Sequence, residues 1–149
     1  MAVSFNLYDE WREAVADPTR SAAIAGTLKL AIVTATYTPD QALHDFFNDI
    51  TNEVTGSNYT AGGNSCATPT WVDGGAGGTM TFDASDPATW VQHASGFSNG
   101  RRAILYYDTG TGSTSRLVGY SNDFGADSGN VAGDFTIAFD AAGIYTAPR

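Results

Sequence analysis

Apolar residues in the first sixteen positions repeat with the period of a helix. The spacing i, i+4, i+7 and i+8 predicts one buried face of a helix over about residues 6–16, made by Leu7, Trp11, Ala14 and Val15. Asn6 is placed to cap this helix, and Asp17-Pro18 should end it. The pattern therefore predicts one amphipathic helix at the start of the chain.

A second helix is predicted over about residues 39–51. Thr38 can cap it, Pro39 suits the first helical position, and Gln41 can complete a capping box. The apolar face of this helix, spaced i, i+3, i+4 and i+7, would consist of Leu43, Phe46, Phe47 and Ile50. We expect the two helix faces to be buried together.

The remaining apolar runs are short and rich in strand-forming residues. Residues 28–34 read as a central strand. Further strands are predicted at residues 66–72, 78–83, 89–93, 101–108, 116–120 and 135–139. Turns are indicated by Gly62-Gly63, Gly74-Gly75, Gly77-Gly78 and the segment 109–112. These patterns predict a single domain, residues 1–149, that is mainly β (α+β): an antiparallel β-sandwich or barrel-like domain with the two helices of its first third packed on it.

The charge of the chain limits the kinds of molecule that it can bind. Charged residues make up only 15% of the chain, and its net charge of −9 comes mostly from aspartates set against six arginines and one lysine, Lys29. Because such a field repels phosphate and no basic stripe interrupts it, we expect no nucleic-acid partner. Low charge with many Gly, Ser and Thr residues is typical of surfaces that assemble.

Cysteine content and hydropathy bear on the compartment. A single cysteine, Cys66, excludes an internal disulfide and a cysteine-rich zinc site, which favours synthesis in a reducing cytoplasm. No apolar run approaches the roughly 20 residues that span a bilayer, and the opening segment lacks the features of a secretory signal. We therefore expect a soluble protein that has no membrane partner.

The candidate catalytic groups form no convincing constellation. Nucleophilic catalysis needs a base, and His44 and His93, the two histidines, match no catalytic signature. Two aspartate pairs, Asp83 with Asp86 and Asp123 with Asp127, are close enough in sequence to share a proton or a cation, but turn and cap roles are favoured. We predict no catalytic, cofactor-binding or metal-binding residues, no cofactor, and no enzymatic activity.

Three other features have both a structural and a binding interpretation. Residues 74–78 are glycine-rich but lack the lysine of a phosphate-binding loop. The basic pair Arg101-Arg102 should place one arginine against a carboxylate such as Asp108 or Asp123. A sugar-stacking platform could be formed by Trp71, Trp90, Tyr106, Tyr107 and Tyr120, although strand alternation sends at least half of them to the core. A glycan site therefore stays open as an alternative.

The order of several segments resembles a group of small phage virion-associated proteins. The resemblance runs through residues 34–40 (TATYTPD), 44–50 (HDFFNDI), 52–54 with 59–63, 81–84 with Trp90, 101–107 (RRAILYY), 117–120, 123–125, 133–137 and 142–144. It extends from the opening segment 5–15 to the end of the chain. The resemblance supplies no catalytic residue.

What the resemblance implies is a structural role in the virion. The expected function is that of a phage capsid decoration or cement protein, made in the host bacterial cytoplasm, that binds the outer capsid lattice and stabilises the head. Its expected partners are the major capsid protein and copies of itself, most simply in a homotrimer. The alternatives are a tail or head-fibre component with a glycan- or receptor-binding surface and, less favoured, a polysaccharide hydrolase. The segment before residue 5 and residues 145–149 are predicted to be free arms that order on binding.

Overall fold

The computed structural model describes residues 1–16, 25–73 and 78–148. The predicted helix end at Asp17-Pro18 and the glycines at 74, 75 and 77 lie outside the described residues. Within them the fold consists mainly of antiparallel β-structure in two sheets, with one α-helix and no closed barrel.

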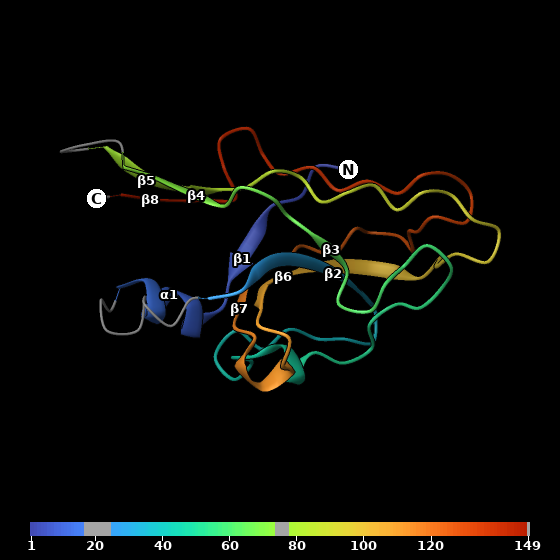
Figure 1. The fold of residues 1–149 in the computed structure, drawn as a ribbon, viewed down its shortest axis with the longest axis horizontal. Helices are drawn as coiled ribbons and strands as arrows, with labels where there is room; N and C mark the ends of the chain where they lie inside the picture. Colours follow the sequence, from blue (N-terminus) through green and yellow to red (C-terminus); the bar gives the residue numbers. More distant parts are fainter. Residues whose placement is uncertain (17–24, 74–77, 149) are drawn as a thin grey trace.

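A five-stranded antiparallel sheet forms the centre of the molecule (Figure 1). Its strands run in the order β1-β7-β6-β2-β3. Their bounds are β1 Phe5–Leu7, β2 Thr27–Thr34, β3 Asn64–Ser65, β6 Gly100–Asp108 and β7 Leu117–Ser121. The longest pairing joins β2 to β6, with Leu30 opposite Leu105. The predicted strands at 28–34, 101–108 and 116–120 are thus confirmed.

Side chains alternate between the two faces of this sheet, and both faces are covered. One face, here called the apolar face, is made by Leu28, Leu30, Ile32, Ala103, Leu105, Tyr107 and Val118. The opposite one, the mixed face, carries Lys29, Ala31, Val33, Ile104, Tyr106 and Leu117. Burial on both sides explains why β2 and β6 read as continuous apolar runs instead of alternating ones.

A three-stranded sheet and the helix lie over the apolar face. The sheet has the order β4-β5-β8, with β4 Thr70–Asp73, β5 Thr79–Asp83 and β8 Tyr145–Pro148. In Figure 1 it lies on the same side of the molecule as the helix α1, Asp9–Ala16. The large side chains that fill the layer beneath these elements and the adjoining loops are Trp11, Phe82, Trp90, Phe97 and Phe135. Aromatic packing therefore joins the two sheets.

The first helix exists but starts later than predicted. Asn6 belongs to β1 and pairs with Tyr120, so it caps nothing. The helix begins at Asp9, where the Arg12 amide donates to the Tyr8 carbonyl. Its predicted apolar face is confirmed: Leu7, Trp11 and Ala14 are buried and Val15 is half-buried. An ion pair between Glu10 and Arg116, both largely buried, ties the helix to the start of β7.

The second predicted helix is wrong. The Asp40 carboxylate accepts the amides of Ala42 and Leu43, and the chain makes only one turn there. A short 3-10 helix, η1 Phe47–Asp49, follows. Side-chain acceptors compete with helical carbonyls for these amides, and residues 45–47 bond instead to the chain at 115–117. Leu43 is 74% exposed, and Phe46, Phe47 and Ile50 are half-buried. Phe47 and Ile50 pack on the mixed face, whereas Trp11 packs on the apolar one, so the expected joint burial of the two helix faces is wrong.

Two predicted strands are isolated bridges instead. Residues 89–93 and 135–139 meet at Trp90 and Phe135, whose amides and carbonyls exchange two hydrogen bonds. The strand predicted at 66–72 survives only as β4, while that at 78–83 is confirmed as β5. Segments 84–99 and 122–140 otherwise follow irregular paths on the right of Figure 1. A second 3-10 helix, η2 Gly112–Thr114, begins at the last residue of the turn predicted at 109–112.

Neither end of the described chain is a free arm. The Met1 amine donates to the Thr136 carbonyl at 2.9 Å, and Ala2 forms a parallel bridge with Ala138. Residues 145–148 form β8, paired with β5. The prediction failed because backbone hydrogen bonds, which need no apolar side chains, anchor both segments.

Candidate functional site

One cluster of charged side chains lies on the mixed face, where β2 and β6 pair. Lys29 stands opposite Tyr106 in the register, and Asp108 lies two residues further along β6, so both point to the same face. The Lys29 Nζ is 2.7 Å from the Asp108 Oδ2. Their side chains are 26% and 24% exposed, so the pair is largely withdrawn from water.

The other oxygen of Asp108 is also fixed. Its Oδ1 accepts the amide of Gly110 at 2.8 Å and the Ser115 hydroxyl at 3.4 Å. The hydrogen bond from Lys29 is the main cause that lowers the pKa of Asp108, and the Gly110 amide adds to it. The carboxylate is therefore held in one orientation by groups on both sides.

A second carboxylate, Glu53, stands beside this pair. Its Oε1 accepts the Tyr59 hydroxyl and the Gly62 amide, each at 2.6 Å. Burial is the largest effect on this group and raises the pKa of Glu53, while its hydrogen bonds and the charge of Lys29 act in the opposite direction. Burial thus makes this carboxyl hold a proton more tightly than an exposed one would, and the charge of Lys29 acts on it from nearby.

Aromatic rings and glycines complete the wall of this site. Phe47 stacks on Tyr106 with ring centroids 4.0 Å apart, and the Tyr106 hydroxyl donates to the Gly62 carbonyl at 2.8 Å. Gly62 has a positive φ of 86°, and a Cβ there would lie 4.0 Å from the Lys29 Nζ. The hollow between these groups measures about 290 Å³. We call it the Lys29 site.

A larger and more apolar hollow lies between α1 and the small sheet. It measures about 400 Å³ and is lined by Leu7, Trp11, Arg12, Val15, Trp71, Met80, Tyr145 and Ala147. Arg12 is its one charged lining residue, held to Asp9 at 3.5 Å with both side chains well exposed. We call it the α1 groove. Its chemistry suits an apolar contact better than a reaction.

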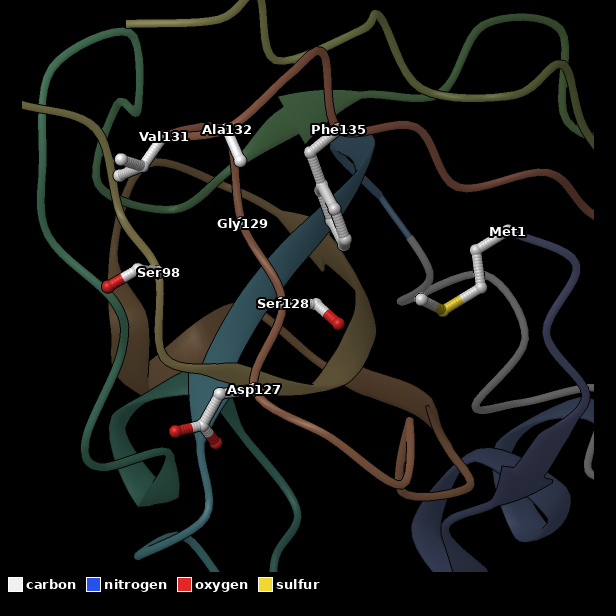
Figure 2. Close-up of a pocket in the computed structure, with 8 residues that line it drawn as sticks. All are labelled: Met1, Ser98, Asp127, Ser128, Gly129, Val131, Ala132 and Phe135. Atoms are coloured by element: carbon white, nitrogen blue, oxygen red, sulfur yellow. The ribbon is translucent and has the colours of Figure 1, made fainter. Parts of the chain in front are cut away.

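A third hollow, of about 430 Å³, lies between the chain start and residues 127–135 (Figure 2). Its polar side chains are Ser98, Asp127 and Ser128. Figure 2 shows these three pointing away from one another, with Met1 and Phe135 on the far side. They do not converge on a common point, so we assign no chemistry to this hollow.

The histidines and aspartates considered from the sequence have local structural partners. His44 Nδ1 contacts the Tyr37 hydroxyl at 2.8 Å, and His93 Nδ1 accepts the Ser95 amide at 3.0 Å. Asp83 accepts the following amide of Ala84, whereas Asp86 accepts the distant amide of Phe139. The local contact of Asp83, and that of Asp123 with the Gly125 amide, agree with the predicted turn and cap roles, whereas Asp86 makes a long-range contact. No group of three or more metal-ligating side chains gathers anywhere in the described ranges.

The basic pair Arg101-Arg102 binds one carboxylate with both members. Arg101 lies 2.7 Å from Asp123 and 3.4 Å from Asp127, and Arg102 lies 3.6 Å from Asp123. Arg101 falls in an irregularity of the β2–β6 register, which frees its neighbour from strict alternation. Asp123 is thus a correct prediction of the arginine partner, whereas Asp108 pairs with Lys29.

The proposed aromatic platform does not form. Trp90, Tyr106 and Tyr107 are buried, and they lie on different faces of the sheet. Trp71 is 39% exposed on β4 of the three-stranded sheet and stacks against Trp11, whereas Tyr120 lies on β7 of the five-stranded sheet. Exposed aromatic surface is therefore concentrated at the α1 groove.

Comparison with known proteins adds no relative. No protein-family model, curated protein or solved structure matches this chain. Over residues 1–16, 25–73 and 78–148, no helix is long and apolar enough to cross a membrane.

Sequence reasoning missed the Lys29 site. Its one usable signal is that the single lysine of the chain interrupts an apolar strand. Glu53 carries no local motif, and only the folding of residues 52–54 against β2 brings it close.

Proposed function

We propose that this protein is a phage capsid decoration or cement protein that binds the outer lattice of the major capsid protein and stabilises the head. The observation that carries the proposal is an apolar contact surface at one end of the molecule. There, Trp71 on β4 is 39% exposed and lines the α1 groove together with Val15 and Met80. Exposed clusters of large apolar side chains mark surfaces that bind other proteins.

The backbone at this surface favours the same use. β4 is an edge of its sheet and pairs on one side only, with β5. An edge strand offers unpaired amides and carbonyls to an extended partner segment, so main-chain bonds and the Trp71 side chain can act together. Trp is also the residue type that most often dominates interface energies.

The fold and the charge of the molecule are compatible with a rigid protein that binds to the capsid. The two sheets packed through an aromatic core would form a sandwich-like body, and the net charge of −9 favours basic patches on a partner. With both described termini bound to the body, docking would use a preformed surface instead of ordering arms. We propose a homotrimer, so that several weak contacts act together on the lattice.

Binding to capsids tests the proposal. Heads lacking the protein are mixed with wild type, with Trp71→Lys, or with Val91→Lys as the control, since Val91 is 56% exposed outside the α1 groove. We expect wild type and the control to bind at regular lattice positions in cryo-EM maps and to raise the melting temperature of the head. Trp71→Lys should bind at least about tenfold more weakly. A protein found only at the tail tip, or absent from virions, would overturn the assignment.

Glycan binding is the second candidate. One observation favours it, the polar Lys29 site with the half-buried ring of Phe47 in its wall. Binding of the free protein to a glycan array, lost in Phe47→Ala and retained in Trp71→Lys, would favour this candidate over the cement role. Release of fragments from a host polysaccharide would instead favour the hydrolase.

A further inference from the structure

The Lys29 site combines the groups needed to join two side chains covalently. We propose that Lys29 and Asp108 become linked by an intramolecular amide bond, formed with loss of one water molecule, and that Glu53 carries the proton. The inference does not depend on the capsid role. It rests on how these three side chains are placed on β2, β6 and the segment 52–54.

Proximity is the first part of the argument. The nitrogen of Lys29 already lies 2.7 Å from the Asp108 Oδ2, and each side chain is anchored by a strand of the central sheet. Reacting groups held in this way behave as if at a very high local concentration, on the order of 10⁵ M or more. An amide that forms negligibly between free amine and carboxylate can then form within the fold.

The surroundings of Asp108 supply the second part. During attack on its Cγ, negative charge develops on one carboxylate oxygen. Oδ1 already accepts the Gly110 amide at 2.8 Å, and the Ser115 hydroxyl lies 3.4 Å away. Donors fixed before the reaction stabilise such a charge without reorganisation. Oδ2, which faces Lys29, is the oxygen that leaves.

Glu53 supplies the third part of the argument. The ion pair of Lys29 and Asp108 cannot react while the lysine is an ammonium ion, so a proton must first be removed from it. The Lys29 ammonium gives one proton to Glu53, and its nitrogen lone pair then attacks the Asp108 Cγ. Oδ2 takes that proton from Glu53 and a second one from the nitrogen, and the Cγ–Oδ2 bond breaks to release water. Glu53 returns to its carboxylate form, so atoms and charge balance.

The surroundings of Glu53 favour the protonated form that this carboxyl takes during the reaction. Glu53 is partly buried, and the stacked rings of Phe47 and Tyr106 close one side of the site. Low polarity favours the protonated form of this carboxyl. Because the bond consumes both the Lys29 amine and the Asp108 carboxylate, each chain can form it only once.

Intact-mass spectrometry of the full chain tests the bond. We expect the wild-type mass to fall by one water molecule after folding. Lys29→Arg is the matched control, because it keeps a cation beside Asp108 but has no primary amine for the reaction. Its mass should be that of the sequence. Glu53→Gln keeps acceptors for Tyr59 and Gly62, and it should slow bond formation by about a hundredfold or more.

The position of the bond is tested by digestion, since Lys29 is the only lysine. After unfolding, trypsin should release residues 21–101 joined to residues 103–116, because the modified lysine is no longer cleaved. An amine-reactive reagent should label the chain terminus alone. A water loss that persists in Lys29→Arg would reflect a cyclised aspartate, such as that of Asp73-Gly74, and an unchanged wild-type mass would leave an ordinary ion pair. Either result overturns the proposal.

Discussion

The two faces of the central sheet are stabilised in different ways. The apolar face is covered by aromatic rings from α1, the small sheet and the distant loops, and most of these rings are almost fully buried. The mixed face is covered by the irregular segment 37–51, where hydroxyl groups and an imidazole lie among the rings, and the ion pair of Glu10 with Arg116 lies beside this segment. The apolar face is therefore stabilised mainly by hydrophobic burial, which has no preferred direction. The mixed face is stabilised mainly by polar contacts, which require a fixed orientation.

Because of this difference, the apolar face is suited to stabilising the fold and the mixed face to holding reactive side chains in fixed positions. Filling space between two sheets needs only apolar volume, so many side chains can contribute to the apolar face. The mixed face must satisfy each buried polar group, which fixes the positions of those groups closely. The Lys29 site, with its three ionisable side chains, lies on this mixed face, where hydrogen bonds and ion pairs fix the positions of polar groups.

The largest expected effect comes from the apolar face. Phe82 is fully buried and packs against Trp71 and Trp11, with ring centroids 4.9 and 5.7 Å away. Phe82→Ala should lower the free energy of unfolding by about 3–5 kcal/mol. Phe46→Ala, on the other face, removes a half-buried ring beneath Arg116 and should cost about half as much. Urea denaturation measures both free energies of unfolding. Equal decreases in the two variants would contradict the expected difference between the faces.

A smaller effect is expected from one hydroxyl on the mixed face. Tyr8 and Tyr37 are joined at 2.9 Å between their hydroxyls, and Tyr37 continues to His44. Tyr8→Phe leaves the Tyr37 oxygen without this partner and should cost about 1 kcal/mol. Tyr107→Phe is the control on the apolar face, since no hydrogen bond to its hydroxyl occurs within the described residues. The melting temperatures of both variants are measured against wild type. An equal drop for Tyr8→Phe and Tyr107→Phe would contradict the expected difference between the two faces.

The same difference explains which elements could be predicted from the sequence. Strands β2 and β6 are long apolar runs whose composition alone indicates burial. The apolar face of α1 was also evident, since Trp11 and Ala14 keep helical spacing. Such elements follow from residue type and period, which a single sequence contains.

The segment over the mixed face could not be predicted in this way. Residues 39–51 have both helical spacing and capping residues, yet Asp40 and Asp49 bind nearby amides with their carboxylates. Contacts with the chain at 115–117, some 70 residues away, then replace the helical bonds. The position of Glu53 beside Lys29 depends on this long-range pairing, so the candidate site is not visible in local patterns.

The smallest expected effect is a change in the pH dependence of stability. Burial raises the pKa of Glu53 above its ordinary value of 4.5, so the native state binds this proton more tightly than the unfolded chain. The contribution of Glu53 is fully present below pH 4.5 and is lost as the pH rises through the higher native pKa. Glu53→Gln cannot titrate and should lack this decline, which for one group is at most about 1.4 kcal/mol per pH unit. Urea denaturation at a series of pH values from 4.5 upward measures it, with Glu13→Gln at an exposed position of α1 as the control. An identical decline in wild type and Glu53→Gln would show that burial of this carboxyl does not distinguish the mixed face from the apolar one.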